Sequence, residues 1–300
     1  MVGSALIRSI PKTYELITAS REELDLNQHK EVASFFKENS VDAVILAAAL
    51  VGGIGANTYS HKEFLVENLM IQNGVLLGAS EANVPNFVFL GSSCIYPKLA
   101  AQPIKESSIL SGRLEPSNEG YALAKISGVR LAQAIYEQNN LNYFSLMPTN
   151  LYGPNDNFDL HKGHVPAALM RKFHEAKLNN DPKVIVWGTG TPRREFMHVD
   201  DLARACWHML GQNVGGELIN IGTGSDISIS DFAKLMAGVV GYNGSIEFDT
   251  SKLDGTPRKL LDVTKAKSYG WEYQVQLRQG LESTYEWFVE ALEKGEVRGI

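Results

Sequence analysis

Residues 86–90 (NFVFL) form an almost continuous apolar run, and residues 91–97 (GSSCIYP) follow it with serine hydroxyls and a thiol. Short apolar runs without polar alternation are typical of strands that are buried on both faces of a parallel sheet. In a doubly wound sheet, the ligand binds at the carboxyl ends of the strands. This stretch therefore predicts both an α/β fold and a place where polar side chains would face a ligand.

Similar runs recur on either side of this strand. We expect further strands at residues 15–18 (ELIT), 42–48 (DAVILAA), 143–147 (YFSLM) and 183–187 (KVIVW). Helical periodicity appears at 61–82 and 121–136, so strands and helices alternate as they do in βαβ units. After about residue 151, glycine, proline and asparagine interrupt this pattern and shorter elements follow, which indicates a second, smaller lobe.

The composition excludes several classes of protein. The chain has 300 residues, of which 44% are hydrophobic and 21% charged, and this excludes a disordered or fibrous protein. Its 28 Lys and Arg against 34 Asp and Glu give a net charge of −6 without a basic cluster, so neither nucleic acid nor a membrane is expected as a partner. Two cysteines cannot staple a chain of this size, and the first residues lack the pattern of a signal peptide. We therefore expect a cytoplasmic protein that binds a small molecule or another protein.

Tyr121 and Lys125 are separated by four positions and would share one face of the helix at 121–136. An ammonium beside a phenol favours the phenolate, so we expect Lys125 to lower the pKa of Tyr121 from its usual value of about 10. Taken alone, this pair could belong to a solvated helix face, and the serines to a polar turn. Together with Ser92, however, the pair forms the Ser, Tyr, Lys set of short-chain dehydrogenases, which use a nicotinamide cofactor. Ser92 would polarise a carbonyl, Tyr121 would move its proton, and Lys125 would also hold the nicotinamide ribose.

Five strings make the resemblance specific. They are GSSCIYPKLA (91–100), YALAK (121–125), MPTNLYGPNDNF (147–158), VIVWGTGTPRREFMHVDD (184–201) and DGTPRKLLD (254–262). With them the chain resembles the GDP-L-fucose synthase family of the extended short-chain dehydrogenases. The resemblance implies a Rossmann-type doubly wound parallel sheet. It also implies inversion of carbons 3 and 5 of GDP-4-keto-6-deoxy-D-mannose, followed by NADPH-dependent reduction of the 4-keto group to give GDP-L-fucose. The alternatives are another nucleotide-sugar epimerase or dehydratase of the same fold, or a cofactor-deficient, non-catalytic module that binds a nucleotide sugar.

The resemblance also assigns site residues. Cys94 and His164 match the family positions of the acid and the base of epimerisation, beside the catalytic set of Ser92, Tyr121 and Lys125. The matching substrate positions are Lys172, Trp187, Arg194, Asp254 and Lys259. Arg194 and Lys259 suit a diphosphate because they bring positive charge into an acidic protein. Where this chain has Lys172 the family has arginine, which puts a bidentate contact there in doubt. Asp200 and Asp201 are expected to cap a helix at 202–210, and no metal site is expected.

The cofactor is expected to be NADP(H). Arg21 follows the strand at 15–18 without a carboxylate at the strand end, which favours the 2′-phosphate of NADP over the ribose hydroxyl of NAD. The family pattern places cofactor contacts at Arg21, Leu24, Asp25, Leu26, Ala48, Ala49, Leu90, Gly91, Ser92, Ser93, Lys125, Pro148, Thr149, Asn150, Leu151 and His164.

The resemblance also implies a domain organisation. Residues 1–150 would form the NADP-binding Rossmann domain. Residues 151–300 would form mainly the substrate-binding lobe, with strand 183–187 and parts of later segments returning to the sheet. A homodimer is the family expectation, with the helix at 121–136 as a candidate surface.

The first residues carry an incomplete phosphate turn. A Rossmann fold opens with a strand and a GxxGxxG turn, whose glycines let the backbone approach a pyrophosphate. The sequence MVGSA (1–5) resembles the end of that turn, so we expect the first strand of the sheet to be missing from this chain. Either Met1 is an internal methionine of a longer protein, which the intact downstream strings favour, or the chain is truncated and binds NADP weakly.

Overall fold

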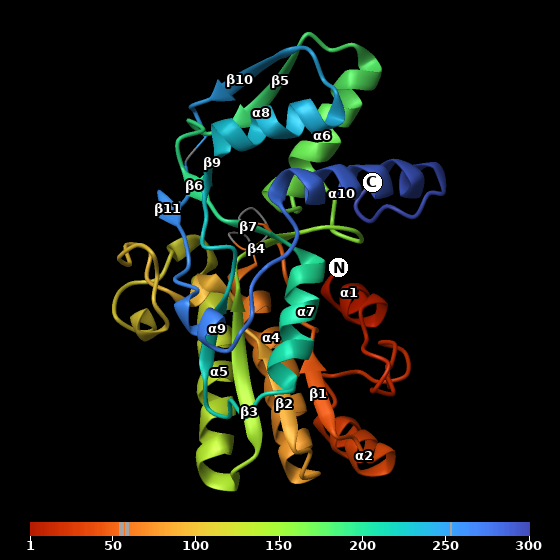
Figure 1. Cartoon of the computed structure of the whole chain (residues 1–300), viewed down its shortest axis with the longest axis vertical. Coiled ribbons are helices and arrows are strands. Elements are labelled where there is room, and N and C mark those ends of the chain that lie inside the picture. The colour runs from red at the N-terminus through yellow and green to blue at the C-terminus, as the bar shows by residue number, and fades with distance from the viewer. Residues whose placement is uncertain (54–56, 58–59, 253) are drawn as a thin grey trace.

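The structure is a computed structural model, and it describes residues 1–53, 57, 60–252 and 254–300. A parallel sheet covered by helices forms one part of the molecule, and a smaller lobe lies beyond the carboxyl ends of its strands (Figure 1). Among the described residues, no helix is both apolar enough and long enough for a membrane span.

Four strands make the main sheet, in the order β1-β2-β3-β8, and all neighbours are parallel. They are β1 (Ala43–Leu46), β2 (Asn86–Leu90), β3 (Asn142–Pro148) and β8 (Leu218–Ile221). β2, β3 and β8 are buried along nearly their whole length, which explains their continuous apolar sequences. The Rossmann-type α/β fold predicted from the sequence is confirmed.

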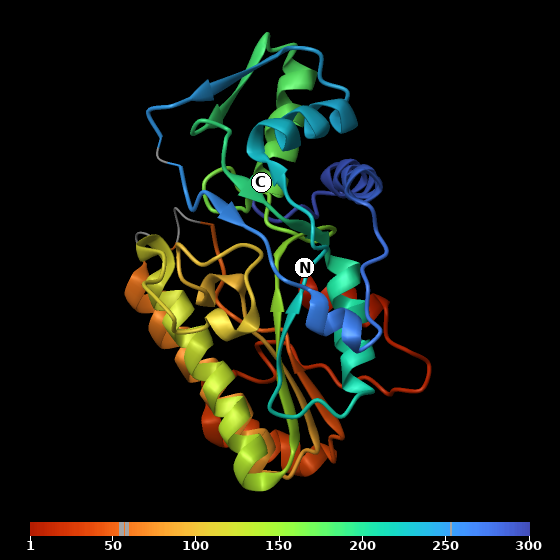
Figure 2. The ribbon, with the colours of Figure 1, turned by 60° about the vertical axis from the view of Figure 1, so that its left-hand side comes forward.

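Helices cover both faces of this sheet. One face carries α2 (His29–Asn39), α4 (His61–Glu81) and α5 (Glu119–Asn139), and the other carries α1 (Val2–Arg8), α7 (Val199–Leu210) and α9 (Thr264–Ser268). Figure 2 shows α4 and α5 side by side along their length. Along β2, Phe87 and Phe89 belong to the core beneath α4 and α5, whereas Val88 and Leu90 belong to the core beneath α7. Successive side chains of a strand point to opposite faces, so one short strand supplies both cores.

The smaller lobe contains three small sheets within the described residues. β5 (Lys183–Trp187) pairs with β10 (Ser245–Asp249), β4 (Asn150–Tyr152) pairs with β7 (Phe196–His198), and β6 (Arg193–Arg194) pairs with both β9 (Ile227–Ser228) and β11 (Arg258–Lys259). A third core lies between these strands and the helices α6 (Val165–Asn179), α8 (Ile229–Val240) and α10 (Leu277–Glu293).

The expectation that strand 183–187 returns to the main sheet is wrong. This strand is β5, which pairs with β10 in the lobe. Its burial alternates: Val184 and Val186 are buried, while Ile185 and Trp187 are 46% and 52% exposed. Alternating burial is typical of a strand in a sheet that has one face packed on a core and the other exposed to solvent. The place beside β3 in the main sheet is taken by β8.

No strand forms at 15–18, contrary to the sequence prediction. Leu16 and Ile17 are exposed, and β1 pairs with β2 alone among the described strands. A strand needs a neighbour to satisfy its backbone N–H and C=O groups. Residues 15–18 make no such pairing, although β1 has a free edge among the described strands, and the segment is an irregular link between α1 and α2.

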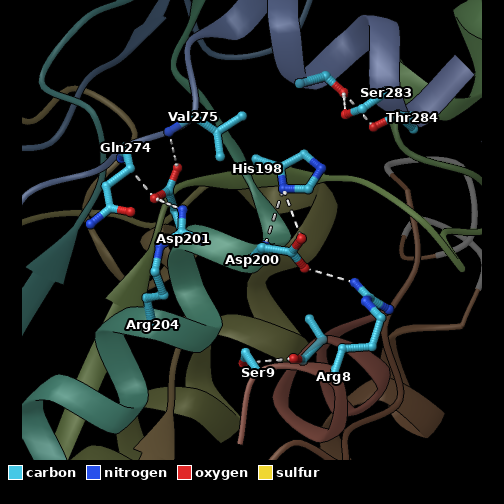
Figure 3. Close-up of polar contacts among 12 residues, drawn as sticks. Arg8, Ser9, His198, Asp200, Asp201, Arg204, Gln274, Val275, Ser283 and Thr284 are labelled. Carbon is cyan, nitrogen blue, oxygen red and sulfur yellow. Dashed lines mark hydrogen bonds and ion pairs between the residues drawn. The ribbon is translucent and has the colours of Figure 1, made fainter. Parts of the chain in front are cut away.

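The start of α7 also differs from expectation, because His198 caps it instead of the two aspartates. The His198 Nδ1 atom accepts a hydrogen bond from the backbone N–H of Asp200 at 3.3 Å (Figure 3). The Asp200 carboxylate pairs with Arg8 of α1 at 2.7 Å. The Asp201 carboxylate accepts from the backbone N–H groups of residues 274 and 275, at 2.8 and 3.0 Å. The two carboxylates therefore tie α7 to α1 and to the segment before α10.

Candidate active site

A cavity of about 270 Å³ lies where the main sheet meets the smaller lobe, at the carboxyl ends of β1, β2 and β3. The five predicted catalytic residues all line it: Ser92, Cys94, Tyr121, Lys125 and His164. Of the other predicted cofactor contacts, it is lined by Ala48, Ala49, Leu90, Gly91, Ser93, Pro148, Thr149, Asn150 and Leu151. Residues that are up to 116 positions apart in the chain, from 48 to 164, thus meet in one place.

The turn after β2 places Ser92 and Cys94. Ser92 has an extended backbone with φ of −161° and caps the 3-10 helix η1 (Ser93–Ile95), and its Oγ accepts from the backbone N–H of Cys94 at 3.2 Å. The Ser92 side chain lies beside Tyr121 in the cavity. Tyr121 and Lys125 lie one turn apart on α5, so the strand turn and the helix bring the Ser, Tyr, Lys set together.

The expectation that Lys125 lowers the pKa of Tyr121 is wrong in this structure. Burial raises the pKa of the Tyr121 phenol above its usual range, and the nearby Cys94 adds to the rise. The Lys125 Nζ lies 5.8 Å from the Tyr121 ring centroid and donates to the carbonyl of Leu90 at 2.9 Å. Burial also lowers the pKa of Lys125 itself, to about 8. Because desolvation outweighs attraction, Tyr121 stays a phenol, which is the form that donates a proton.

Two donors hold the sulfur of Cys94. Asn118 Nδ2 lies 3.2 Å from Cys94 Sγ, and Lys259 Nζ lies 3.7 Å from it. Asn118 ends the 3-10 helix η3 (Pro116–Asn118) and precedes Tyr121 by one helical turn. The sequence analysis missed Asn118, although its spacing from Tyr121 was an available signal. The thiol therefore has a fixed place beside the Ser, Tyr, Lys set.

His164 reaches the cavity from the smaller lobe. It is the N-cap of α6, has an extended backbone, and is followed by Pro166 in the first turn, where proline is favoured. The carboxyl of Asp156 is buried, and its Oδ2 has no hydrogen-bond partner among the described residues. Burial raises the pKa of Asp156, and the charge of His164 opposes that rise. His164 and Cys94 thus enter the cavity from different parts of the fold.

Two cations line the cavity side by side. Arg194 and Lys259 are register partners in the parallel pair of β6 and β11. Their neighbours Arg193 and Arg258 both form ion pairs with the carboxylate of Asp226. Because side chains alternate along a strand, this arrangement leaves Arg194 and Lys259 on the cavity side. An anion that enters the cavity here meets both of them.

Three predicted substrate contacts lie outside the cavity lining. Lys172 Nζ lies 5.2 Å from the ring centroid of Trp187, whose side chain is half exposed. Asp254 accepts from the backbone N–H and the hydroxyl of Thr189, at 2.9 and 2.7 Å, and so holds the turn after β5. Asp254 also precedes Gly255, which does line the cavity. Contacts of Lys172, Trp187 and Asp254 with a substrate stay predictions.

The described residues fit the nicotinamide half of NADP(H). The buried ammonium of Lys125 lies in the cavity with the Ser92 and Tyr121 hydroxyls, and residues 148–151 complete its wall. The four contacts expected for the adenosine half do not line the cavity. Arg21 is exposed, Leu24 and Leu26 pack into the core beneath α2 and α4, and Asp25 accepts from the backbone N–H of Asn27 at 3.1 Å. Their roles stay predictions.

Comparisons with known proteins cover both parts of the molecule. The model of the NAD dependent epimerase/dehydratase family matches residues 1–222. A GDP-L-fucose synthase from Escherichia coli (strain K12) is 49% identical over 301 residues, which cover 97% of this chain and 94% of that protein. Among solved structures, a GDP-6-OMe-4-keto-L-xylo-heptose reductase from C. jejuni has a TM-score of 0.89 at 35% identity, with 96% of this chain and 94% of that chain covered. A GDP-L-fucose synthetase from Naegleria fowleri bound to NADP has a TM-score of 0.88 at 26% identity, with 98% and 92% covered.

Proposed function

The chain belongs to the NAD dependent epimerase/dehydratase family, and we propose that it catalyses the reaction of a GDP-L-fucose synthase. It is an NADP(H)-dependent epimerase and reductase that acts on GDP-4-keto-6-deoxy-D-mannose. The observation that carries the proposal is that a thiol and an imidazole line the same cavity as the Ser, Tyr, Lys set. A carbonyl reductase needs only that set, whereas epimerisation also needs an acid and a base.

The pair Arg194 and Lys259 would bind the diphosphate of the substrate. A diphosphate brings two negative charges into a cavity that these two cations line, and charge-assisted hydrogen bonds to phosphate oxygens are strong. Lys259 also lies 3.7 Å from the sulfur of Cys94, so the diphosphate end and the reacting thiol are close. This contact would set the distance between the anchored nucleotide and the reacting sugar.

Epimerisation would use Ser92, Tyr121, Cys94 and His164. Carbons 3 and 5 both adjoin the 4-keto carbon, so removal of either proton places negative charge on the keto oxygen. The hydroxyls of Ser92 and Tyr121 would stabilise that charge by hydrogen bonds. Cys94 and His164, which come from different elements, would remove a proton on one face of the sugar and return one on the other.

Reduction would use the phenol of Tyr121. Bound NADPH supplies the hydride for the 4-keto carbon. Tyr121 would donate its proton to the keto oxygen, and the raised pKa of Tyr121 keeps that proton in place at neutral pH. Lys125 would hold the nicotinamide ribose, while residues 148–151 position the ring. One phenol would thus serve both half-reactions, first as a hydrogen-bond donor and then as a proton donor.

We also propose a homodimer formed through α4 and α5. These helices lie side by side, and their outer surface carries the exposed apolar side chains Val66, Met70 and Leu77 of α4 and Leu123 of α5. Such a surface resembles the core of an interface more than a solvated helix face.

For the location we propose the cytoplasm, because a reducing compartment keeps the thiol of Cys94 in the form that the mechanism uses. Cell fractionation tests the location.

The function is tested by mixing the protein with GDP-4-keto-6-deoxy-D-mannose and NADPH and following the absorbance of the reduced nicotinamide. The proposal expects NADPH oxidation that depends on the sugar. NADPH oxidation with release of a sugar still in the original configuration at carbons 3 and 5 would identify a reductase that does not epimerise. Sugar binding without any oxidation, in a protein that binds NADPH, would identify a non-catalytic module.

A further inference from the structure

The carboxylate of Glu195 lies between the main sheet and the strands of the smaller lobe, and it is fully buried. Glu195 follows β6 and precedes β7 in the chain. Its Oε1 accepts hydrogen bonds from the backbone N–H groups of Thr223 and Gly224, at 2.6 and 2.7 Å. Its Oε2 accepts from the backbone N–H of Leu261 at 3.0 Å. Three backbone donors from two distant segments therefore converge on one side chain.

The backbone carbonyl of Glu195 makes a second set of contacts. It accepts from the hydroxyl of Thr149 at 3.2 Å and from the side-chain amide of Asn150 at 2.8 Å. Thr149 lies between β3 and β4, Asn150 is the first residue of β4, and both line the cavity. Glu195 thus joins the end of β3, the loop after β8 and the residues after β11.

The fit around this carboxylate is close. A methyl group at Gly222 would overlap Oε1 of Glu195, so glycine is required there if the carboxylate is to keep its position. The loop after β8 therefore supplies two backbone N–H donors to Glu195. It also has a glycine, Gly222, whose missing side chain leaves room for Oε1 of Glu195. Such an arrangement fixes the carboxylate and the two segments that it joins.

These segments carry the two cations of the cavity. Arg194 immediately precedes Glu195. Lys259 is the last residue of β11 and lies two residues before Leu261. The two cations are register partners, but β6 and β11 are only two residues long each. So short a ladder fixes relative position weakly, and the contact between Glu195 and Leu261 adds a third fixed point beside it.

We propose that Glu195 is a positioning residue whose carboxylate holds Arg194 and Lys259 at the spacing that receives a diphosphate. The proposal rests on the proposed function, because it takes the diphosphate of a nucleotide sugar as the anion that these cations bind. According to the proposal, the Glu195 carboxylate affects the nucleotide end of the site. The backbone carbonyl of residue 195 keeps its contacts with Thr149 and Asn150 when the side chain is replaced.

The test uses two variants that disturb the same contacts from opposite sides. Glu195→Gln replaces one acceptor oxygen by an amide donor, and Gly222→Ala pushes the carboxylate away without changing Glu195. Gly238→Ala is the matched control, because Gly238 is exposed on α8 and a methyl group there meets nothing within 4 Å. Circular dichroism identifies variants that fold.

Isothermal titration calorimetry then gives the dissociation constants of GDP and of NADPH. We expect both folded variants to bind GDP about tenfold more weakly, with a KM for the nucleotide sugar that rises similarly and an NADPH affinity within about twofold of the parent protein. Gly238→Ala should bind both ligands as the parent does. Unchanged GDP affinity in both variants, or an equal loss for GDP and NADPH, would overturn the proposal.

These readouts separate the proposal from the proposed function. Weaker GDP binding in the variants of a protein that never turns over the sugar would support the positioning role and refute the synthase reaction. Turnover by the parent protein together with unchanged GDP affinity in the variants would refute the positioning role alone.

Discussion

At the residue scale, we propose separate duties for Cys94 and Tyr121, although both line the same cavity. Cys94 has donors from Asn118 and Lys259 around its sulfur, whereas Tyr121 is a half-buried phenol beside Ser92. The first arrangement suits proton transfer at carbon, and the second suits proton transfer to a carbonyl oxygen. Substitutions at the two positions should therefore impair different steps.

Cys94→Ser should slow epimerisation about 100-fold or more with a smaller effect on reduction, and Tyr121→Phe should abolish reduction first. Deuterium uptake from heavy water at carbons 3 and 5 measures epimerisation, and NADPH oxidation measures reduction. Cys206→Ala is the control, because Cys206 is buried in the core beneath α7 and should leave both rates unchanged. Equal loss of both steps in both variants would refute this division.

Lys125 gives a pH-dependent prediction about stability. Its side chain is buried and its pKa in the folded protein is lowered to about 8 by desolvation. The pKa of lysine in the unfolded chain is about 10.4, so at pH values between about 8 and about 10.4 the unfolded chain binds more protons than the folded protein. The contribution of Lys125 to the free energy of unfolding therefore rises with pH across this range. The rise should be about 3 kcal/mol in total.

Urea unfolding of the parent protein and of Lys125→Met, at pH values from about 7 to about 10, measures this contribution. The free energy of unfolding of Lys125→Met should exceed that of the parent protein most at about pH 7, where the folded parent buries a charged ammonium. This difference should shrink as pH rises through about 8. A difference between the two proteins that does not vary with pH would show that Lys125 titrates as an exposed lysine does.

At the element scale, the sequence predicts those elements whose own side chains determine them. β2 and β5 lie at the predicted residues, and α4 and α5 differ from prediction by a few residues at their ends, because apolar period and length are local properties. Residues 15–18 failed because a strand depends on a neighbour, and strand 183–187 was placed in the wrong sheet because its one-sided burial depends on what covers it. Glu195 was missed because its role comes from contacts with residues far away in the sequence, whereas the spacing of Asn118 from Tyr121 was a local signal that could have found it.

The anchoring of the segment before α10 gives an element-scale prediction. Asp201 is fully buried and accepts from two backbone N–H groups of that segment, whereas Asp200 pairs with Arg8 near the surface (Figure 3). Asp201→Ala should lower the free energy of unfolding by about 3 kcal/mol, because it leaves buried donors and the Arg204 charge without their acceptor. Asp200→Ala is the matched control and should lower it by less than about 1 kcal/mol, since Asp200 and its partner Arg8 are both partly exposed. Equal effects of the two substitutions in chemical denaturation would contradict this reading of the buried carboxylate.

At the scale of the whole molecule, the site depends on the meeting of two parts. The main sheet supplies Ser92, Cys94, Tyr121 and Lys125, and the smaller lobe supplies His164, Arg194 and Lys259. Neither part alone contains all of the proposed proton-transfer groups together with the cations proposed to bind an anionic substrate. The acidic net charge of the chain therefore coexists with local positive charge where the two parts meet.

The proposed dimer is a property of the whole molecule as well. Met70→Glu places a charge in the middle of the exposed apolar surface of α4, so it should shift the mass measured by light scattering from dimer to monomer. Leu178→Glu is the matched control, because Leu178 is also exposed but lies on α6 in the smaller lobe. A parent protein that is monomeric at all concentrations, or a dimer that Met70→Glu leaves intact, would contradict the assignment of this surface.

The most direct test of the central claim is the structure of the product formed in heavy water from GDP-4-keto-6-deoxy-D-mannose and NADPH, determined by nuclear magnetic resonance. The account predicts GDP-L-fucose with deuterium at carbons 3 and 5, formed together with stoichiometric NADPH oxidation. A reduced sugar that keeps its original hydrogens and configuration at both carbons would contradict it.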